Sequence, residues 1–283
     1  MKQFQLMMLC SALLAMVACS EAPDQGNRDA LNDVSFEAVL AQPYRAPDQE
    51  IRYGNGALQH GLLWLPDAVA PDGAPLLVMI HGGCWLNAYG VDHVRAFSSA
   101  LADAGYAVWS LEYRRTGDEG GGWPGSLEDV TTALTAAPEL LAQHPVDLSR
   151  TVIAGHSAGG HLALLAGGRQ PELQAVIGLA AITDIIRYAE GDNSCQQATE
   201  PFMGGPFADH QDRYRAANPA EQPRHDRTIL LHGTADALVP TDHANLPGAE
   251  RVLVEQAGHF DWVHPGTPAF HKLLDTLAEV FAQ

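Results

Sequence analysis

One serine of the chain stands in a setting that suits nucleophilic chemistry. Residues 155–159 read Gly-His-Ser-Ala-Gly around Ser157, with a β-branched run before them and an apolar, helix-forming run after them. A strand that turns this sharply into a helix leaves little room for Cβ atoms beside the serine, so glycines flank it. The pattern predicts a strained backbone at Ser157 and a hydroxyl exposed at the start of a helix, as acyl transfer requires.

An acid and a base follow in the order that such a serine needs. An apolar run ends shortly before Asp236, and a valine-rich run ends shortly before His259. In this hypothesis His259 takes the serine proton and returns it to the leaving group, while Asp236 fixes the imidazole tautomer and stabilises its cation. Asp242 is the nearest competitor for the acid, and His264 is a weaker rival for the base.

A second glycine-containing turn is suited to stabilise a developing oxyanion. The segment 81–85 reads His-Gly-Gly-Cys-Trp directly after an apolar run. Glycines let the backbone approach a substrate closely and turn N–H groups toward negative charge, and one such donor is worth roughly 3–4 kcal/mol. The expected donors are the amides of Gly83 and Ala158, with Cys84 or Gly82 as a further one.

The elements that must position these residues alternate along the chain. Strands are expected near 58–65, 75–81, 106–112, 150–155, 175–180, 228–232 and 251–255. Helices are expected near 92–104, 126–143, 158–168 and 267–281. The alternation predicts an α/β fold with a mostly parallel sheet, helices on both faces and the functional residues at the carboxyl ends of the strands.

A long insertion interrupts this pattern at residues 183–226. It is rich in Gly, Pro and polar residues. Long loops in compact domains are usually functional, so we interpret it as a small lid or a wall of the acyl pocket. A surface excursion is the alternative.

With these motifs the chain resembles the α/β-hydrolase superfamily, and within it the esterase and kynurenine-formamidase-like branch. The resemblance rests on 81–85, 155–163, 231–236 and 259–261, and it spans roughly residues 50–283. It implies an α/β-hydrolase fold and catalysis by Ser157, Asp236 and His259. The cysteine at position 84 departs from the branch, where that position is often aromatic or glycine.

The expected function is a serine carboxylic-ester hydrolase that acts on small or aryl esters through an acyl-enzyme. Three alternatives stay open: an arylformamidase that cleaves amides of the N-formylkynurenine type, a serine peptidase like prolyl oligopeptidase, and a non-catalytic binding protein on the same scaffold. Kynurenine breakdown is cytoplasmic, so the export signal described below weakens the arylformamidase alternative. The lack of a propeller-sized N-terminal region weakens the peptidase alternative. No cofactor is expected, and no metal, because no His/Cys cluster has ligand spacing.

Length and net charge limit the number of domains and the classes of binding partner. The chain has 283 residues and a formal net charge of −18. Such a charge argues against electrostatic binding of nucleic acid or anionic lipid. We expect one hydrolase domain at 36–283 and a small-molecule ester or aryl-amide substrate, while the sequence leaves the oligomeric state open.

The N-terminus has the features of an export signal. A lysine at position 2 and an apolar run predict a signal peptide at 1–18. The residues before Cys19 resemble a bacterial lipoprotein cleavage box, so we expect Cys19 to be lipidated and followed by a flexible tether, 19–35. The expected location is the outer membrane, anchored only through that lipid. Ordinary cleavage, giving a periplasmic or secreted protein, is the alternative.

If the protein is exported, its remaining cysteines are expected to form a disulfide bond. If Cys10 leaves with the signal and Cys19 carries lipid, only Cys84 and Cys195 remain. Two cysteines in an oxidising compartment predict one disulfide bond. It would tie the expected oxyanion loop to the insertion and contribute about 4–5 kcal/mol in the chain-entropy account.

Overall fold

An eight-stranded sheet organises residues 31–282, which are the residues that the computed structural model describes. Its spatial order is β1-β2-β4-β3-β5-β6-β7-β8. The strands are β1 (Gln49–Arg52), β2 (His60–Trp64), β3 (Ala74–Ile80), β4 (Ala107–Leu111), β5 (Val146–His156), β6 (Ala175–Leu179), β7 (Thr228–Gly233) and β8 (Glu250–Val254). β1 and β2 run antiparallel at one edge, and the strands from β4 to β8 pair in parallel. The expected α/β-hydrolase fold is therefore confirmed.

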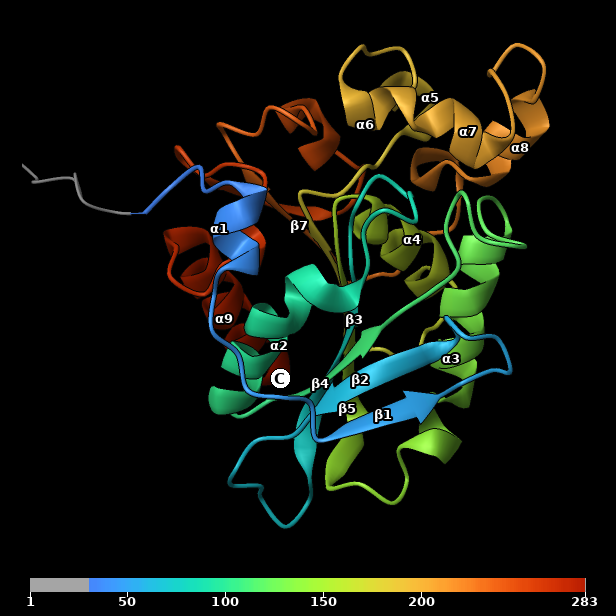
Figure 1. Cartoon of the computed structure of the whole chain (residues 1–283). Helices are drawn as coiled ribbons and strands as arrows, with labels where there is room; N and C mark the ends of the chain where they lie inside the picture. The colour runs from blue at the N-terminus through green and yellow to red at the C-terminus, as the bar shows by residue number, and fades with distance from the viewer. Residues whose placement is uncertain (1–30, 283) are drawn as a thin grey trace, which may run out of the picture. The chain divides into compact units, whose positions relative to one another are not determined.

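Helices cover both faces of this sheet (Figure 1). The α-helices are α1 (Phe36–Leu40), α2 (Arg95–Asp103), α3 (Gly125–Leu140), α4 (Ala158–Gly167), α5 (Ile185–Tyr188), α6 (Ser194–Gln197), α7 (Thr199–Met203), α8 (Gln211–Ala216) and α9 (Pro268–Phe281). Short 3-10 helices occur at η1 (Val91–Val94), η2 (Pro219–Glu221), η3 (Thr241–Ala244) and η4 (Asp261–Val263).

The alternation of side chains along the central strand β3 divides the core in two. Leu76 and Val78 face a cluster built with α3 and α4, whereas Leu77 and Met79 face a cluster built with α2 and α9. Successive strand residues point to opposite faces, so a strand that is buried on both faces needs an uninterrupted apolar run.

The insertion at 183–226 folds into α5 to α8 and η2. In Figure 1, α5 to α8 lie together at the top of the view, above α4. Cys195 and Phe202 from this segment are buried in the same apolar cluster as α4. The insertion is therefore packed onto the domain. Whether it moves as a lid stays a prediction.

The boundary expected for the tether is corrected by the structure. The backbone amides of Asp33 and Val34 each donate to the carboxylate of Asp261, at 2.8 Å, and Val34 is buried. The domain therefore includes residues from Asp33 onward, three before the expected start at 36. The expected signal peptide, Cys19 and the earlier part of the tether lie outside the described residues.

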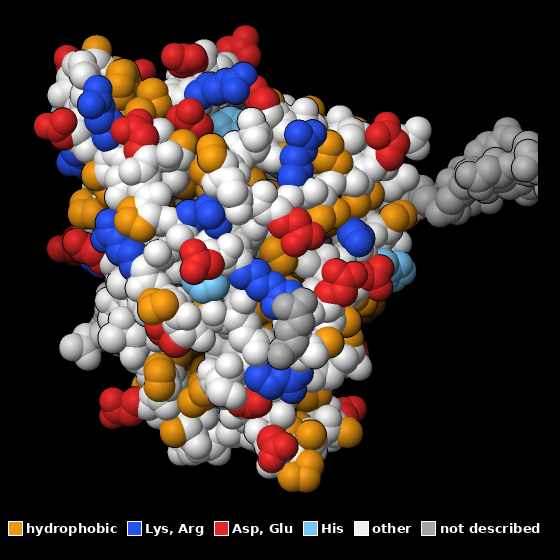
Figure 2. Space-filling model, turned by 180° about the vertical axis from the view of Figure 1, so that it is seen from behind, with side chains coloured by type: hydrophobic (Ala, Val, Ile, Leu, Met, Phe, Trp, Pro, Cys, Tyr) orange, Lys and Arg blue, Asp and Glu red, His pale blue; other side chains and the backbone are white. Residues whose placement is uncertain are grey.

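Two further observations concern the helices and one face of the described part. None of the helices within residues 31–282 is long and apolar enough to cross a membrane. On the face shown in Figure 2, acidic and basic side chains are interspersed among apolar and polar ones.

Candidate active site

Ser157 occupies the turn between β5 and α4. Its φ of 56° and ψ of −120° place it in a region that side chains rarely adopt. A Cβ at Gly155 would collide with the carbonyl of Gly159, and a Cβ at Gly159 would collide with that of Ile80. The flanking glycines are therefore required by sterics. They hold the serine at the head of α4, where the helix end favours negative charge.

The structure brings Asp236 and His259 together at the ends of β7 and β8. His259 Nδ1 donates to Asp236 Oδ2 at 2.8 Å, and the Asp236 side chain is buried. The other carboxylate oxygen accepts the amides of Leu238 at 2.9 Å and Val239 at 2.8 Å. These bonds fix the aspartate, so the imidazole has a defined orientation and presents Nε2 as the proton acceptor.

The charge of Asp236 is maintained despite its burial. Burial alone raises its pKa, but His259 beside it, the hydrogen bond from that ring and the Val239 amide outweigh the penalty, so the net pKa is lowered. A second histidine, His232, has its Nε2 3.5 Å from the same carboxylate and donates to the Val239 carbonyl at 2.9 Å. Burial lowers the pKa of His232, which keeps that ring neutral.

The two rival residues have other roles. Asp242 forms an ion pair with Arg187 at the surface. Nδ1 of His264 accepts the Gly266 amide at 3.1 Å within a turn. Neither lines the cavity that contains Ser157 and His259.

A cavity of about 250 Å³ opens beside the serine. Ser157 and His259 lie in its wall, with exposed fractions of 3% and 6%. The remaining lining residues are Phe36, Glu37, Gly83, Cys84, Leu86, Tyr89, His93, His156, Ser194, Cys195, Leu238 and Phe260. The wall thus combines the oxyanion loop, the insertion, the loop that bears the base and α1. The α1 residues were missed by the sequence analysis.

The loop after β3 has the unusual backbone that an oxyanion site needs. Gly83, Cys84 and Trp85 have φ of 106°, 53° and 57°. Within residues 31–282, the amides of Gly83 and Cys84 donate no hydrogen bond, and both residues line the cavity. The amide of Ala158, first in α4, also lies outside the helix's own hydrogen-bond ladder. These three amides are available to an oxyanion.

Gly82 differs from the expectation that it is a donor. Its amide donates to Nε2 of the buried His93 at 3.3 Å. A Cβ at Gly82 would lie only 3.1 Å from the Cβ of Ser157. Gly82 therefore provides space beside the nucleophile, and its N–H is committed to His93.

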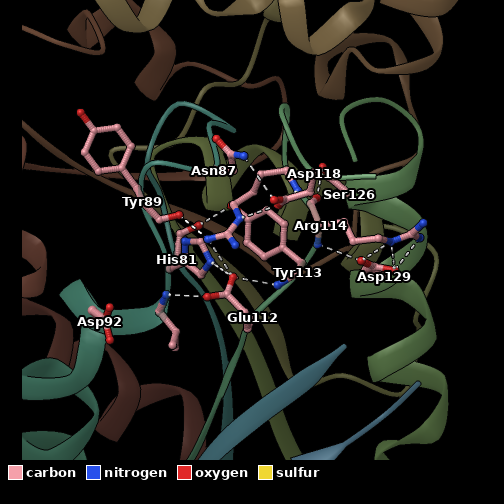
Figure 3. Close-up of polar contacts among 12 residues, drawn as sticks. His81, Asn87, Tyr89, Asp92, Glu112, Tyr113, Arg114, Asp118, Ser126 and Asp129 are labelled. Carbon is pink, nitrogen blue, oxygen red and sulfur yellow. Dashed lines mark hydrogen bonds and ion pairs between the residues drawn. The ribbon is translucent and has the colours of Figure 1, made fainter. Parts of the chain in front are cut away.

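A buried polar network holds the oxyanion loop from below (Figure 3). His81 Nε2 contacts Glu112 Oε1 at 2.9 Å, and the ring stacks on Tyr113 with centroids 4.4 Å apart. Arg115 contacts the same carboxylate oxygen at 3.0 Å, and the Val91 amide donates to the other at 3.1 Å. Burial raises the pKa of Glu112, but His81 and Arg115 dominate and lower it to about 2. A charged Glu112 thus links His81, at the start of the oxyanion loop, to Val91, at the start of η1.

The structure contains the predicted disulfide bond between Cys84 and Cys195, whose Cα atoms are 5.0 Å apart. Cys84 belongs to the oxyanion loop and Cys195 to α6, and both line the cavity. The bond therefore joins the insertion to the catalytic part of the domain. No group of three His, Cys, Asp or Glu suited to a metal ion occurs among the described residues.

Comparisons with known proteins agree with this geometry. The model of the BD-FAE family matches residues 63–247. Esterase LipC of Mycobacterium tuberculosis is 26% identical over 247 residues, which cover 80% of this chain and 60% of the relative. Esterase LipQ of the same organism is 26% identical over 256 residues, covering 84% of this chain and 59% of the relative. This chain therefore spans about 60% of the length of these two relatives.

A solved structure extends the similarity of fold to most of the domain. Esterase B from Lactobacillus rhamnosis superposes with a TM-score of 0.72 at 22% identity, covering 87% of this chain and 90% of that one. At this level of identity the match establishes the shared fold, and the chemistry rests on the site itself.

Proposed function

This chain belongs to the BD-FAE family, and we propose that it is a serine carboxylic-ester hydrolase for small or aryl esters. One observation carries the proposal. Ser157 shares a cavity with His259, whose Nδ1 donates to the buried Asp236 at 2.8 Å. The esterase names of its curated relatives support the same reaction.

The reaction follows from the positions of these groups. Ser157 Oγ attacks the ester carbonyl carbon while His259 Nε2 takes its proton. The oxyanion that forms is stabilised by the amides of Ala158, Gly83 and Cys84. His259 then protonates the departing alcohol, leaving an acyl-serine. Water, deprotonated by His259, attacks this ester, and His259 returns the proton to Ser157 Oγ as the carboxylic acid departs, which regenerates the serine. Asp236 remains ionised throughout.

The cavity supports a small substrate. Its volume of about 250 Å³ lies below the range of roughly 300–1,000 Å³ that is typical of ligand pockets. Leu86, Leu238 and Phe260 supply apolar wall. We therefore propose short acyl groups or a single aromatic ring as the part of the ester that enters the cavity.

The test is hydrolysis of p-nitrophenyl esters from acetate to octanoate, beside N-formylkynurenine and a proline p-nitroanilide. Ser157→Ala should abolish ester turnover and labelling by a fluorophosphonate. Ser194→Ala is the matched control, because Ser194 lines the same cavity without being the nucleophile, and it should retain labelling. Preference for the formamide or the anilide would reassign the enzyme to the corresponding alternative. Absence of fluorophosphonate labelling would favour the remaining alternative, a non-catalytic binding protein.

We also propose that the protein is exported and anchored through a lipid on Cys19. The leader-like sequence at 1–18 supports this, as does the disulfide bond, because disulfides persist in oxidising compartments. Expression of the full chain in a Gram-negative host with labelled palmitate tests it. The parent should carry the palmitate label, and the Cys19→Ala variant should not. Unlabelled protein in the periplasm or the medium would favour ordinary cleavage.

A further inference from the structure

The segment before β1 is attached to the loop that bears the catalytic base. Asp261, two residues after His259, accepts the amides of Asp33, Val34 and Gly258, at 2.8, 2.8 and 3.0 Å. The carboxylate is fully buried. A buried carboxylate with three amide donors is a strong anchor, since such charge-assisted bonds are stronger than neutral ones. The segment is thereby fixed beside the active site, although it lies outside the matched residues 63–247.

Phe36, the first residue of α1, connects the two loops of the site. Its ring lies 5.5 Å from Tyr89 and 5.7 Å from His93, both of which follow the oxyanion loop. It also lies 5.5 Å from Phe260, next to the base. All four residues line the cavity. Removing the Phe36 ring would therefore enlarge the cavity between the two loops.

Glu37 places a negative charge in the same wall. Among the described residues that line the cavity, it is the only Asp, Glu, Lys or Arg. It is exposed, and hydrogen bonds from its own backbone amide and from Ser35 lower its pKa, so it is ionised at neutral pH. No lysine or arginine from residues 31–282 lines the cavity to offset this charge.

We propose that α1 is a substrate-selecting wall, in which Phe36 limits the size of the ester and Glu37 disfavours esters that carry a negative charge. Neutral and cationic esters are the favoured class. The inference rests on the proposed esterase function, since it concerns the substrate of that site. Because Glu37 faces solvent, its effect is that of a screened charge, modest at low salt and smaller at high salt.

Matched esters test the charge selection. The parent, Glu37→Gln and Glu37→Lys are compared on phenyl butanoates bearing a para trimethylammonium, tert-butyl or carboxylate group, and on mono-p-nitrophenyl succinate against p-nitrophenyl pentanoate. The kcat/KM of anionic relative to neutral esters should rise by about two- to fivefold in Glu37→Gln and further in Glu37→Lys. Glu139→Lys, on the exposed side of α3 away from the cavity, is the control and should leave the ratios unchanged. Equal shifts in Glu37→Lys and Glu139→Lys, or none in either series, would overturn the charge selection.

Size selection is tested with the acyl series. Phe36→Ala should move the preferred p-nitrophenyl ester to longer acyl chains, while Phe36→Leu should move it less. Thermal melts establish that both variants are folded. An unchanged chain-length profile in folded Phe36→Ala would contradict a wall at this position.

A second readout separates this inference from the esterase proposal. The rate at which Ser157 is labelled by a trimethylammonium-bearing phosphonate, relative to its neutral tert-butyl analogue, requires no ester turnover. This ratio should fall in Glu37→Lys. If esters are not hydrolysed but the labelling ratio falls, the wall stands and the esterase assignment does not. If esters are hydrolysed and neither ratio responds, the wall is wrong and the esterase assignment stands.

Discussion

The amide of Gly82 donates a hydrogen bond to Nε2 of His93, 11 residues further along the chain, at 3.3 Å. An imidazole nitrogen that accepts a hydrogen bond carries no proton, so His93 is neutral with its proton on Nδ1. Burial and the neighbouring His81 and His156 hold the pKa of His93 well below its usual value, which agrees with a neutral ring. His93 therefore fixes the peptide that precedes the proposed oxyanion donors.

His93 is accordingly expected to act as a positioning residue. His93→Leu removes the acceptor, so the loop should lose its fixed orientation and kcat should fall about tenfold or more, with a smaller change in KM. His93→Gln keeps an acceptor and should recover part of the loss. Steady-state kinetics on a p-nitrophenyl ester provide the measurement. Equal kcat values for the parent and a folded Leu variant would exclude this role.

Asp236 and its former rival Asp242 offer a matched pair for the acid. Asp236→Asn should leave the fold intact but permit the wrong tautomer of His259, lowering kcat by roughly 10³–10⁴-fold. Asp242→Asn removes a surface ion pair with Arg187 and should change kcat little. The pair is compared under the same assay conditions. A large loss in the Asp242 variant together with a small one in the Asp236 variant would reverse the assignment.

Glu112 is expected to make the domain sensitive to acid. Its pKa in the folded protein is about 2, against an ordinary value of 4.5. Because the folded pKa is the lower one, the stabilisation is complete above about pH 4.5 and is lost as the pH falls toward 2. The shift corresponds to roughly 3 kcal/mol as an order of magnitude.

The measurement is urea unfolding of the parent and Glu112→Gln at pH 7 and at pH 3. The variant should be less stable at pH 7, and the difference between the two proteins should shrink at pH 3. Glu128→Gln, in the first turn of α3 and outside this network, controls for removal of a carboxylate. A difference that is the same at both pH values would show that the Glu112 charge does not stabilise the loop.

The nucleophile turn could be predicted from sequence because its requirements are local. The glycines at 155 and 159 are imposed by contacts with the turn itself and with the neighbouring strand end. The long apolar runs likewise predicted β3, β6 and β7, because strands buried on both faces leave a continuous signal. β1 was missed because only one of its four residues, Ile51, is apolar.

The parts that sequence reasoning missed depend on contacts between distant segments. Phe36 and Glu37 enter the cavity wall because Asp261, more than two hundred residues away, binds the backbone ahead of them. A cap signal was present at Ser35, whose side chain accepts the Ala38 amide at 3.2 Å. It predicts a helix start but gives no information about which surface the helix covers.

The disulfide bond is expected to influence both stability and catalysis. It joins Cys84, in the oxyanion loop, to Cys195, in α6, across 111 residues. Closing a loop of that length is worth about 4–5 kcal/mol in the chain-entropy account. The Cys84→Ser/Cys195→Ser double variant should therefore unfold at lower denaturant concentration. Because the bond also ties the oxyanion loop to the insertion, its kcat should be lower as well.

Reduction provides the decisive comparison, because the double variant has no bond between these positions to lose. Dithiothreitol should lower the kcat and the unfolding midpoint of the parent toward the values of the double variant, and it should leave the double variant unchanged. If reduction lowers the unfolding midpoint of the parent but not its kcat, the bond stabilises the domain without positioning the oxyanion loop. The three amides beside Ser157 would then be held by the Glu112 network and by His93 alone.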